Sequence, residues 1–501
     1  MALVASILEP HVEAARSVAD RVETAADLVE FRIDGMERVD SQALLAGRRK
    51  AVVVACPSVD EGGRYTGSID GRLARLRAAA EAGASYVDLD WRVADRLTDL
   101  PGRCRRIVSM HLPGGMPADL PGAVRFLQSL AGPSDLIKLV PHSDRLEDAL
   151  DLARLVQDGG GKVIAFATGR AAMVSRLLAT AAGSPLIYAA PQAGSETAPG
   201  QPTLAELRAV LPPRAGSGTT AVFAVVGKPV GHSLSPATHS IALRMLQLDA
   251  MFLAFEPDDF LQFLDKVTPL NCIRGLAVTA PFKEDALRRS DRADETAKGI
   301  VAANTLIRTE QGWRAANTDD DGAADAIELG LEGKLLGRRV LVLGSGGAAR
   351  AAAAGVRRRG AQLILASRKR AAAEKLAQHF GGTAVDWSAV GEVDYDVLVN
   401  ATPVGQWPNA TESPIPESAV RPGALVIDAV VRPPETGLAR MAKARGAKFV
   451  PGVQWFLFQA IRQFRLFTGQ EPPIGAMRAT AIDALKREPK LLPGLIAPAV
   501  L

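Results

Sequence analysis

The sequence predicts an α/β protein made of two units, and three observations lead to this prediction. Up to residue 211, short apolar runs alternate eight times with amphipathic segments of helical spacing. Residues 212–220 then bring together Pro, Gly and Ser, which disfavour both helix and strand. Beyond them a different α/β pattern carries a glycine fingerprint. We therefore expect a first unit, a linker at 212–220, and a second unit from residue 221.

Length, charge and cysteine content argue against several classes of protein, namely nucleic-acid-binding, membrane-spanning and zinc-binding proteins. A chain of 501 residues exceeds what one core usually fills, which favours two or three domains. The net charge of +4 is small for this length, and no basic run is long enough to follow a nucleic-acid backbone. No apolar run approaches the roughly 18–20 residues that cross a bilayer. Only three cysteines occur, without CxxC spacing, so we expect no structural zinc and a soluble, cytoplasmic protein.

The first unit contains eight predicted strands, rich in Val, Ile and Leu as expected for strands covered on both faces. They are Leu3–Ile7, Leu28–Ile33, Ala51–Cys56, Tyr86–Trp91, Arg106–Met110, Asp135–Val140, Lys162–Ala167 and Pro185–Ala190. Eight βα units in about 200 residues predict a (β/α)8 TIM barrel. A doubly wound open sheet is the alternative, because periodicity does not show whether a sheet closes.

A barrel places its active site where strands end and βα loops begin. Polar residues at those ends are therefore candidates, and here they are Glu30, Arg32, Glu61, His111 and Lys138. Lys138 lies among aliphatic residues, where desolvation disfavours the charged amine. A neutral amine can attack a ketone and form an imine that acts as an electron sink. The alternative is a lysine at a strand end that reaches solvent.

Taken together, these residues and several short motifs give the first unit a resemblance to type I 3-dehydroquinate dehydratase. The motifs are Glu30-Phe31-Arg32, Glu61-Gly62-Gly63, Ser109-Met110-His111, Ile137-Lys138, Ser175-Arg176 and Thr197-Ala198-Pro199-Gly200-Gln201. The resemblance implies that Lys138 forms the imine and that His111 is the general acid and base. It also implies that Glu30 orients His111, and that Arg32 and Glu61 contact the substrate.

The same resemblance gives Arg176 a bidentate grip on the substrate carboxylate, with Thr197 and Gln201 closing over the site. One departure concerns Pro57, which stands where the family usually has an arginine. Proline cannot donate a charge-assisted hydrogen bond, so affinity is the property we expect to differ.

The second unit begins with a strand, Val222–Gly227, followed by Ser233 and Ser235, whose hydroxyls can bind an anion in one pocket. An ordinary Ser/Pro helix cap is the alternative. Farther along, apolar strands end near Thr279, Lys283, Asn304 and Asp319, which predicts polar groups gathered at a sheet edge. A Lys–Asp pair beside a substrate hydroxyl could relay its proton.

A dinucleotide fingerprint follows in the third region. The strand Arg338–Leu343 runs into Gly344, Ser345, Gly346, Gly347 and Ala348 and then into an alanine-rich helix, whose N-terminus can receive a pyrophosphate. The next strand ends in Ser367-Arg368-Lys369-Arg370. NAD-binding versions place an acidic residue here, whereas arginines suit a 2′-phosphate, so Ser367, Arg368 and Arg370 predict NADP.

These residues give the second unit a resemblance to shikimate dehydrogenase. The resemblance implies that Lys283 and Asp319 are the catalytic pair, and that Ser233 and Ser235 hold the substrate carboxylate. It further implies that Thr279, Asn304 and Gln459 bind ring hydroxyls, and that Asn400, Thr402 and Val404 lie beside the nicotinamide. Val431 stands where the family often has tyrosine, so quinate is an alternative substrate of this unit.

The two implied reactions are consecutive, which predicts a bifunctional lyase and NADP-dependent oxidoreductase of the shikimate pathway, serving aromatic amino acid biosynthesis. Its ligands would be 3-dehydroquinate, 3-dehydroshikimate and shikimate, with no nucleic acid and no membrane; the sequence does not indicate the oligomeric state. The expected domains are a barrel at 1–211, a substrate domain at 221–324 completed by 453–488, and an NADP domain at 325–452. The alternatives are an inactive structural barrel and an imine-forming aldolase.

Overall fold

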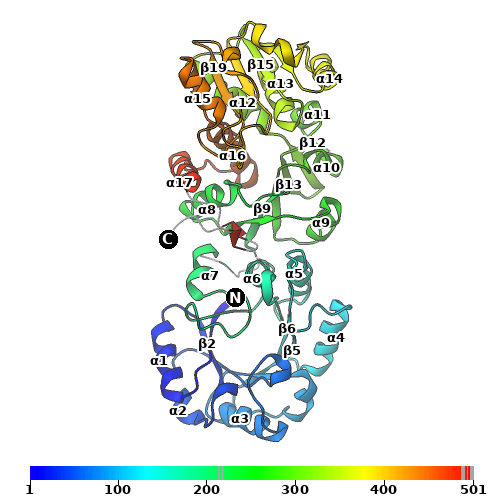
Figure 1. Ribbon diagram of the computed structural model, residues 1–501. Coiled ribbons are helices and arrows are strands. Elements are labelled where there is room, and N and C mark those ends of the chain that lie inside the picture. Colours follow the sequence, from blue (N-terminus) through cyan, green and yellow to red (C-terminus); the bar gives the residue numbers. More distant parts are fainter. Residues whose placement is uncertain (213–214, 216–218, 487–490, 493–494, 497–501) are drawn as a thin grey trace.

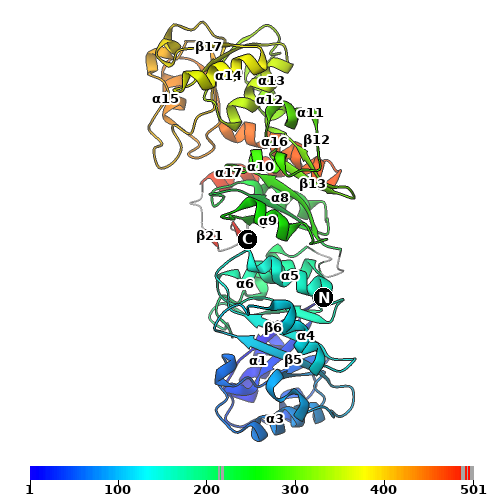
Figure 2. The ribbon, with the colours of Figure 1, turned by 90° about the vertical axis from the view of Figure 1, so that its right-hand side faces the viewer.

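The computed structural model describes residues 1–212, 215, 219–486, 491–492 and 495–496. Figures 1 and 2 show three bodies stacked along one long axis, with the barrel at one end and the body that contains β15 and β19 at the other. The predicted linker at 212–220 falls partly outside the described residues, because 213, 214 and 216–218 are not among them. None of the described helices has the length and apolar character needed to span a membrane.

The first body confirms the predicted barrel. Its strands are β1 (Ala2–Ile7), β2 (Leu28–Arg32), β3 (Val52–Ala55), β4 (Tyr86–Asp90), β5 (Arg105–Leu112), β6 (Leu136–Pro141), β7 (Val163–Ala165) and β8 (Leu186–Ala189). Its helices are α1 (Val12–Val22), α2 (Ser41–Leu45), α3 (Ile69–Glu81), α4 (Leu120–Leu130), α5 (Asp148–Asp158), α6 (Ala172–Ala181) and α7 (Leu204–Val210). The sheet order β7-β6-β5-β4-β3-β2-β1-β8 follows the chain without reversal, which excludes the doubly wound alternative.

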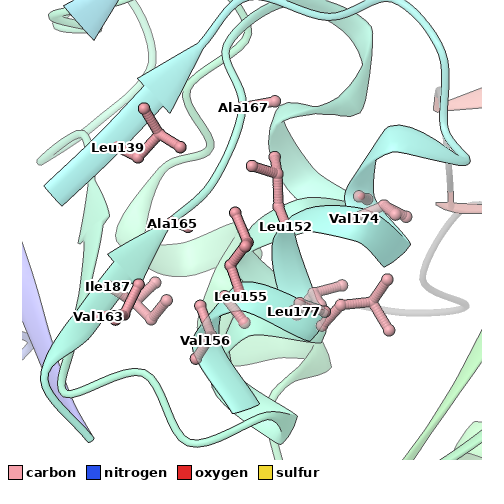
Figure 3. Close-up of a cluster of buried hydrophobic side chains, with 14 of the residues drawn as sticks. Leu139, Leu152, Leu155, Val156, Val163, Ala165, Ala167, Val174, Leu177 and Ile187 are labelled. Carbon is pink, nitrogen blue, oxygen red and sulfur yellow. The ribbon is translucent and has the colours of Figure 1, made fainter. Parts of the chain in front are cut away.

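The barrel wall has two faces that alternate along each strand. Figure 3 shows Leu139 of β6 and Val163 and Ala165 of β7 beside the leucine and valine side chains of α5 and α6. Because successive residues of a strand point to opposite faces, Lys138 lies on the interior face of β6. The alternation of side chains along β6 therefore places Lys138 inside the barrel, on the face opposite to Leu139.

The second body contains a mixed sheet of order β10-β9-β11-β13-β14-β12. Its strands are β9 (Ala221–Val226), β10 (Ala250–Phe255), β11 (Ile273–Val278), β12 (Arg292–Ala293), β13 (Thr305–Thr309) and β14 (Gly312–Ala316). The helices α8 (Ser235–Met245), α9 (Phe260–Val267), α10 (Lys283–Arg288) and α11 (Glu295–Ile300) follow these strands. Residue Lys266 of α9 pairs with Asp151 of the barrel helix α5 at 2.6 Å, so this body contacts the barrel directly.

The third body is a parallel sheet of order β17-β16-β15-β18-β19-β20, which reverses beside β15 as in a Rossmann fold. Its strands are β15 (Arg339–Leu343), β16 (Gln362–Ala366), β17 (Thr383–Val385), β18 (Val397–Asn400), β19 (Leu425–Asp428) and β20 (Lys448–Val450). Its helices are α12 (Asp319–Leu331), α13 (Gly347–Arg358), α14 (Arg370–Phe380) and α15 (Gly437–Ala444). The chain then returns through α16 (Gly452–Thr468) to α17 (Ile474–Lys486), which packs on α8, and ends in the short pair β21 (Leu491–Leu492) and β22 (Leu495–Ile496).

Candidate active sites

The interior of the barrel holds a cavity of about 320 Å³. All the predicted barrel site residues line it: Glu30, Arg32, Glu61, His111, Lys138, Arg176, Thr197 and Gln201. Residue Pro57 also lines the cavity and contributes no charge there. The barrel therefore brings together side chains that lie up to 171 residues apart in the chain, from Glu30 to Gln201.

Lys138 is 5% exposed and does not reach solvent. Its Nζ forms an ion pair with Asp88, which is equally buried on β4. The sequence showed only aliphatic neighbours along the strand, whereas in the folded barrel the amine of Lys138 lies against a carboxylate. Desolvation alone would raise the pKa of Asp88, but Lys138 and His111, with hydrogen bonds from Lys138 and Ser109, hold it below its usual value.

Asp88 is a site residue that the sequence reasoning missed. It interrupts the apolar strand Tyr86–Asp90, just as Lys138 interrupts its own strand. A buried charge in a strand interior needs a partner of opposite sign, so the signal was present in the sequence.

Glu61, and not Glu30, is the carboxylate beside the histidine ring, which corrects the predicted role of Glu30. His111 Nδ1 lies 3.8 Å from Glu61 Oε1, and neither atom has a hydrogen-bond partner among the described residues. The other oxygen of Glu61 accepts from Ser58 and pairs with Arg72 Nη1 at 2.7 Å. Burial, with the positive charge of Lys138, lowers the pKa of His111 to about 3, so the ring is neutral at neutral pH.

Glu30 instead anchors the loop that covers the cavity. Its carboxylate accepts a hydrogen bond from Ser6 Oγ, which lies 3.2 Å from Thr197 Oγ1. The backbone amide of Thr197 donates to Gln201 Oε1 at 2.7 Å. The loop residues Thr197 and Gln201 are thus tied to the barrel interior.

Arg176, on α6, lies between β7 and β8, the two ends of the barrel's strand order, which do not pair with each other among the described residues. Its Nη1 donates to the carbonyls of Ala167 and Ala172, and its Nε donates to that of Tyr188. These bonds connect the segment after β7 with β8, and they leave each bidentate edge of the guanidinium with one nitrogen already bonded. Arg32 is similarly held, because Asp34 accepts from its Nε at 2.8 Å and its Nη2 at 2.9 Å.

A second cavity, of about 240 Å³, lies between the middle body and the cofactor-binding body. Its lining includes every residue predicted to catalyse or bind substrate in this unit: Ser233, Ser235, Thr279, Lys283, Asn304, Asp319 and Gln459. Lys283 Nζ lies 2.6 Å from Asp319 Oδ2, and both side chains are partly exposed to the cavity. This geometry allows the pair to exchange a proton with a bound hydroxyl.

The amide side chains of this cavity form a network with one member that sequence reasoning missed. Asn304 Nδ2 donates to Thr318 Oγ1 at 2.9 Å and to Gln459 Oε1 at 3.3 Å. Gln463, one turn after Gln459 on α16, donates to the backbone carbonyl of Asn304. Its i+4 spacing from Gln459, which places the two amides on one face of α16, was the available signal.

The glycine-rich turn before α13 fits a dinucleotide. Gly344 has a φ of +117°, and a Cβ there would lie 2.8 Å from the Ala401 carbonyl oxygen, so only glycine suits this turn. Gly346 caps α13, and a Cβ at Gly347 would lie 3.8 Å from Lys283 Cδ. The helix N-terminus therefore lies close to Lys283, with Ser345 and Ala348 on the same turn.

The basic segment after β16 divides into two parts. Arg370 is paired with Glu374 at 2.9 Å and with Asp386 at 2.8 Å, so its guanidinium already contacts two carboxylates. Arg368 is exposed, and Ser367 Oγ lies 3.3 Å from Ser345 Oγ beside the glycine turn. Arg368 is accordingly the better placed of the two predicted arginines.

Asn400, Thr402 and Val404 form one tight loop after β18. Asn400 Oδ1 accepts from the Thr402 amide and hydroxyl, and Asn400 Nδ2 donates to Asp428 Oδ1 and to the Val404 carbonyl. Because Asn400 is fully buried and bonded within the protein, its side chain shapes the loop rather than offering a free group to a ligand. Burial raises the pKa of Asp428, beneath this loop, to about 6.

Sequence comparisons match the bodies one by one. Residues 3–216 match the model for type I 3-dehydroquinase, and residues 225–306 match the substrate binding domain of shikimate dehydrogenase. Residues 452–482 match the shikimate 5′-dehydrogenase C-terminal domain, and residues 339–432 match a model described as NADP oxidoreductase, coenzyme F420-dependent. The fold and the two cavities thus define a two-site α/β enzyme, with a lysine-centred barrel joined to a dinucleotide-dependent dehydrogenase.

Individual relatives lead to a particular family. The chloroplastic bifunctional 3-dehydroquinate dehydratase/shikimate dehydrogenase of Arabidopsis thaliana is 32% identical over 90% of this chain and 79% of its own length. The shikimate dehydrogenase (NADP(+)) of Thermococcus kodakarensis is 36% identical, covering 53% of this chain and 97% of the relative. The Thermus thermophilus shikimate 5-dehydrogenase, solved with NADP(H) and shikimate, is 36% identical with a TM-score of 0.50, covering 53% of this chain and all of that one. The chain belongs to the family of bifunctional 3-dehydroquinate dehydratase/shikimate dehydrogenases.

Proposed function

We propose that the protein dehydrates 3-dehydroquinate to 3-dehydroshikimate in its barrel and then reduces this product to shikimate with NADPH. The observation that carries the proposal is that each cavity contains a lysine paired with an aspartate, surrounded by groups suited to one of the two reactions. The family relationship to bifunctional enzymes that join these activities supports both assignments.

In the barrel, Lys138 is the nucleophile. The unprotonated amine bonds through Nζ to the ring ketone carbon, its two protons pass to the ketone oxygen, which leaves as water, and a C=N bond forms. After the ring has lost its hydroxyl, water adds to this C=N bond and the C–N bond breaks, which releases the product ketone and restores the amine. His111, neutral because its pKa is held low, removes the neighbouring ring proton and returns it to the departing hydroxyl. Glu61 Oε1, at 3.8 Å from Nδ1, keeps the ring oriented while it carries the proton.

The remaining barrel residues hold the substrate. Glu30, fixed by Ser6, accepts from a ring hydroxyl, and Thr197 and Gln201 cover the ring. Arg176 supplies positive charge for the carboxylate, and Arg32 lines the same cavity. The absence of an arginine at Pro57 leaves one contact fewer than the family pattern has.

In the second cavity, Lys283 and Asp319 move the proton of the substrate hydroxyl. Ser233 and Ser235 bind the substrate carboxylate, and Thr279, Asn304 and Gln459 bind ring hydroxyls. NADPH, when bound, supplies the hydride. The glycine turn from Gly344 to Ala348 would hold its pyrophosphate, Ser367 and Arg368 its 2′-phosphate, and the loop through Thr402 and Val404 its nicotinamide.

We also propose the domain division 1–211, 221–324 with 453–488, and 325–452. The change from one sheet to the next between β14 and β15 supports it, with the boundary at 324/325 falling inside α12. We propose a cytoplasmic location because the chain has only three cysteines and all three are free, which is in keeping with a reducing compartment.

Borohydride trapping tests the barrel assignment. Incubating the protein with 3-dehydroquinate and borohydride should reduce the imine and add the ligand mass to Lys138, as found by intact mass and peptide mapping. The Lys138→Ala variant should show no adduct and should retain NADP-linked shikimate oxidation. A wild-type protein that is not trapped would favour the alternative of a purely structural barrel.

A further inference from the structure

Tyr188 is a buried residue of the barrel cavity to which the mechanism above gives no role. It lies on β8, is 3% exposed, and lines the same cavity as Lys138. Lys138 Nζ lies 4.9 Å from the centroid of its ring, and the Phe166 ring lies beside it at 5.7 Å. The ring therefore supports the nucleophile from one side.

The hydroxyl of Tyr188 is the unusual part. Its Oη is buried and has no hydrogen-bond partner among the described residues. A buried polar group without a partner costs free energy, so packing alone would favour phenylalanine, as at Phe166. The tyrosine Tyr86, in the same interior cluster, differs because its hydroxyl accepts a hydrogen bond from Arg105.

The surroundings of Tyr188 keep its hydroxyl protonated, so that Oη can donate a hydrogen bond. Burial, together with the Glu30 and Asp88 carboxylates, raises its pKa well above the ordinary value. The phenol therefore stays protonated at every pH at which the enzyme would work. A ligand oxygen that enters the cavity beside Lys138 would find an O–H group that has no other acceptor.

We propose that Tyr188 is a further catalytic residue of the barrel, donating a hydrogen bond from Oη to the substrate's ketone oxygen while Lys138 attacks. In this step Nζ bonds to the carbonyl carbon, the C=O π bond breaks, and the oxygen takes one of the two amine protons and becomes a hydroxyl. The C–O bond then breaks, the hydroxyl takes the second amine proton and leaves as water, and C=N forms. Tyr188 keeps its own proton throughout and stabilises the oxygen as charge develops on it. This proposal rests on the proposed dehydratase function.

The Tyr188→Phe variant separates this role from a structural one. Removing one hydrogen bond of about 1.4 kcal/mol should lower the dehydratase kcat about tenfold and slow borohydride trapping at Lys138 in parallel. The melting temperature should stay the same or rise, because an unpartnered buried hydroxyl has been removed. Shikimate oxidation by the same chain should not change.

The matched control is Tyr86→Phe, which removes a hydroxyl that does have a partner. This variant should lose stability and keep the dehydratase kcat. Wild-type kcat and trapping rate in Tyr188→Phe would overturn the proposal, and so would a fall in melting temperature that accounts for the lost activity. If borohydride did not trap the wild type, the proposed dehydratase function would be refuted, and the role of Tyr188 would be refuted with it. If the wild type were trapped and Tyr188→Phe were trapped equally fast, only the role of Tyr188 would be refuted.

Discussion

Replacing Asp88 with asparagine tests the buried ion pair at the centre of the barrel. Asp88 and Lys138 are both about 5% exposed, so solvent cannot compensate the lysine once its partner is neutral. Removing one member of a buried pair typically costs about 3–5 kcal/mol. For a unit of this size, roughly 2–4 °C is lost per kcal/mol, so the barrel should melt roughly 6–20 °C lower.

The pH dependence of this loss has a definite sign. In the wild type the lowered pKa of Asp88 makes its contribution fully present above about pH 4. The Asp88→Asn variant lacks this contribution at every pH. The difference in stability between wild type and variant should therefore shrink as the pH falls below about 4 and through the lowered pKa of Asp88.

Calorimetry of the full chain measures this loss, with the dehydrogenase transition as an internal reference. The double variant Asp88→Asn/Lys138→Met should recover most of the loss, because no uncompensated charge remains. A difference that does not change with pH, or a double variant no more stable than Asp88→Asn, would refute the ion-pair reasoning.

Three further predictions concern single residues. Lys283→Ala should lower shikimate oxidation by about 10²–10⁴-fold and leave dehydration intact, and loss of both activities in a folded variant would contradict independent sites. Arg368→Asp should shift the ratio of kcat/KM for NADP and NAD toward NAD, whereas Arg370→Ala should change it little; an equal shift in both would show that Arg370 also binds the phosphate. Because the pKa of His111 is lowered to about 3, the pH profile of the dehydratase kcat/KM should show no acid limb from this residue near its ordinary pKa of about 6.5. The burial argument would be contradicted if the wild type showed such a limb and a His111→Asn variant with residual activity did not.

The sequence predicted the elements of this fold better than the pairings inside the sites. All eight barrel strands could be predicted because each is a short run of aliphatic residues. Such runs are typical of strands that are buried on both faces. Lys138 stood out for the same reason, since a charge in such a run is costly. The partner of Lys138 could not be predicted in the same way, because it lies on another strand. Asp88 is on β4, which is not adjacent to β6 in the sheet.

The roles of Glu30 and Glu61 were exchanged for a similar reason. Glu30 lies near the end of one predicted strand and Glu61 follows the next, so position in the chain gave no ground for choosing the one that faces His111. The structure decides through the 3₁₀ turn Val59–Glu61, which places the Glu61 carboxylate 3.8 Å from the ring. Arg370 shows the same limit, because its partner Asp386 lies after the next strand and could not be paired from local sequence.

The most direct test of the whole account is the absorbance of NADPH after 3-dehydroquinate is added to the purified chain. Two working sites in one chain predict that the absorbance falls without any added enzyme. They also predict that Lys138→Ala abolishes the fall with 3-dehydroquinate but keeps it with 3-dehydroshikimate. A Lys138→Ala variant that still consumed NADPH at the wild-type rate with 3-dehydroquinate would contradict the central claim.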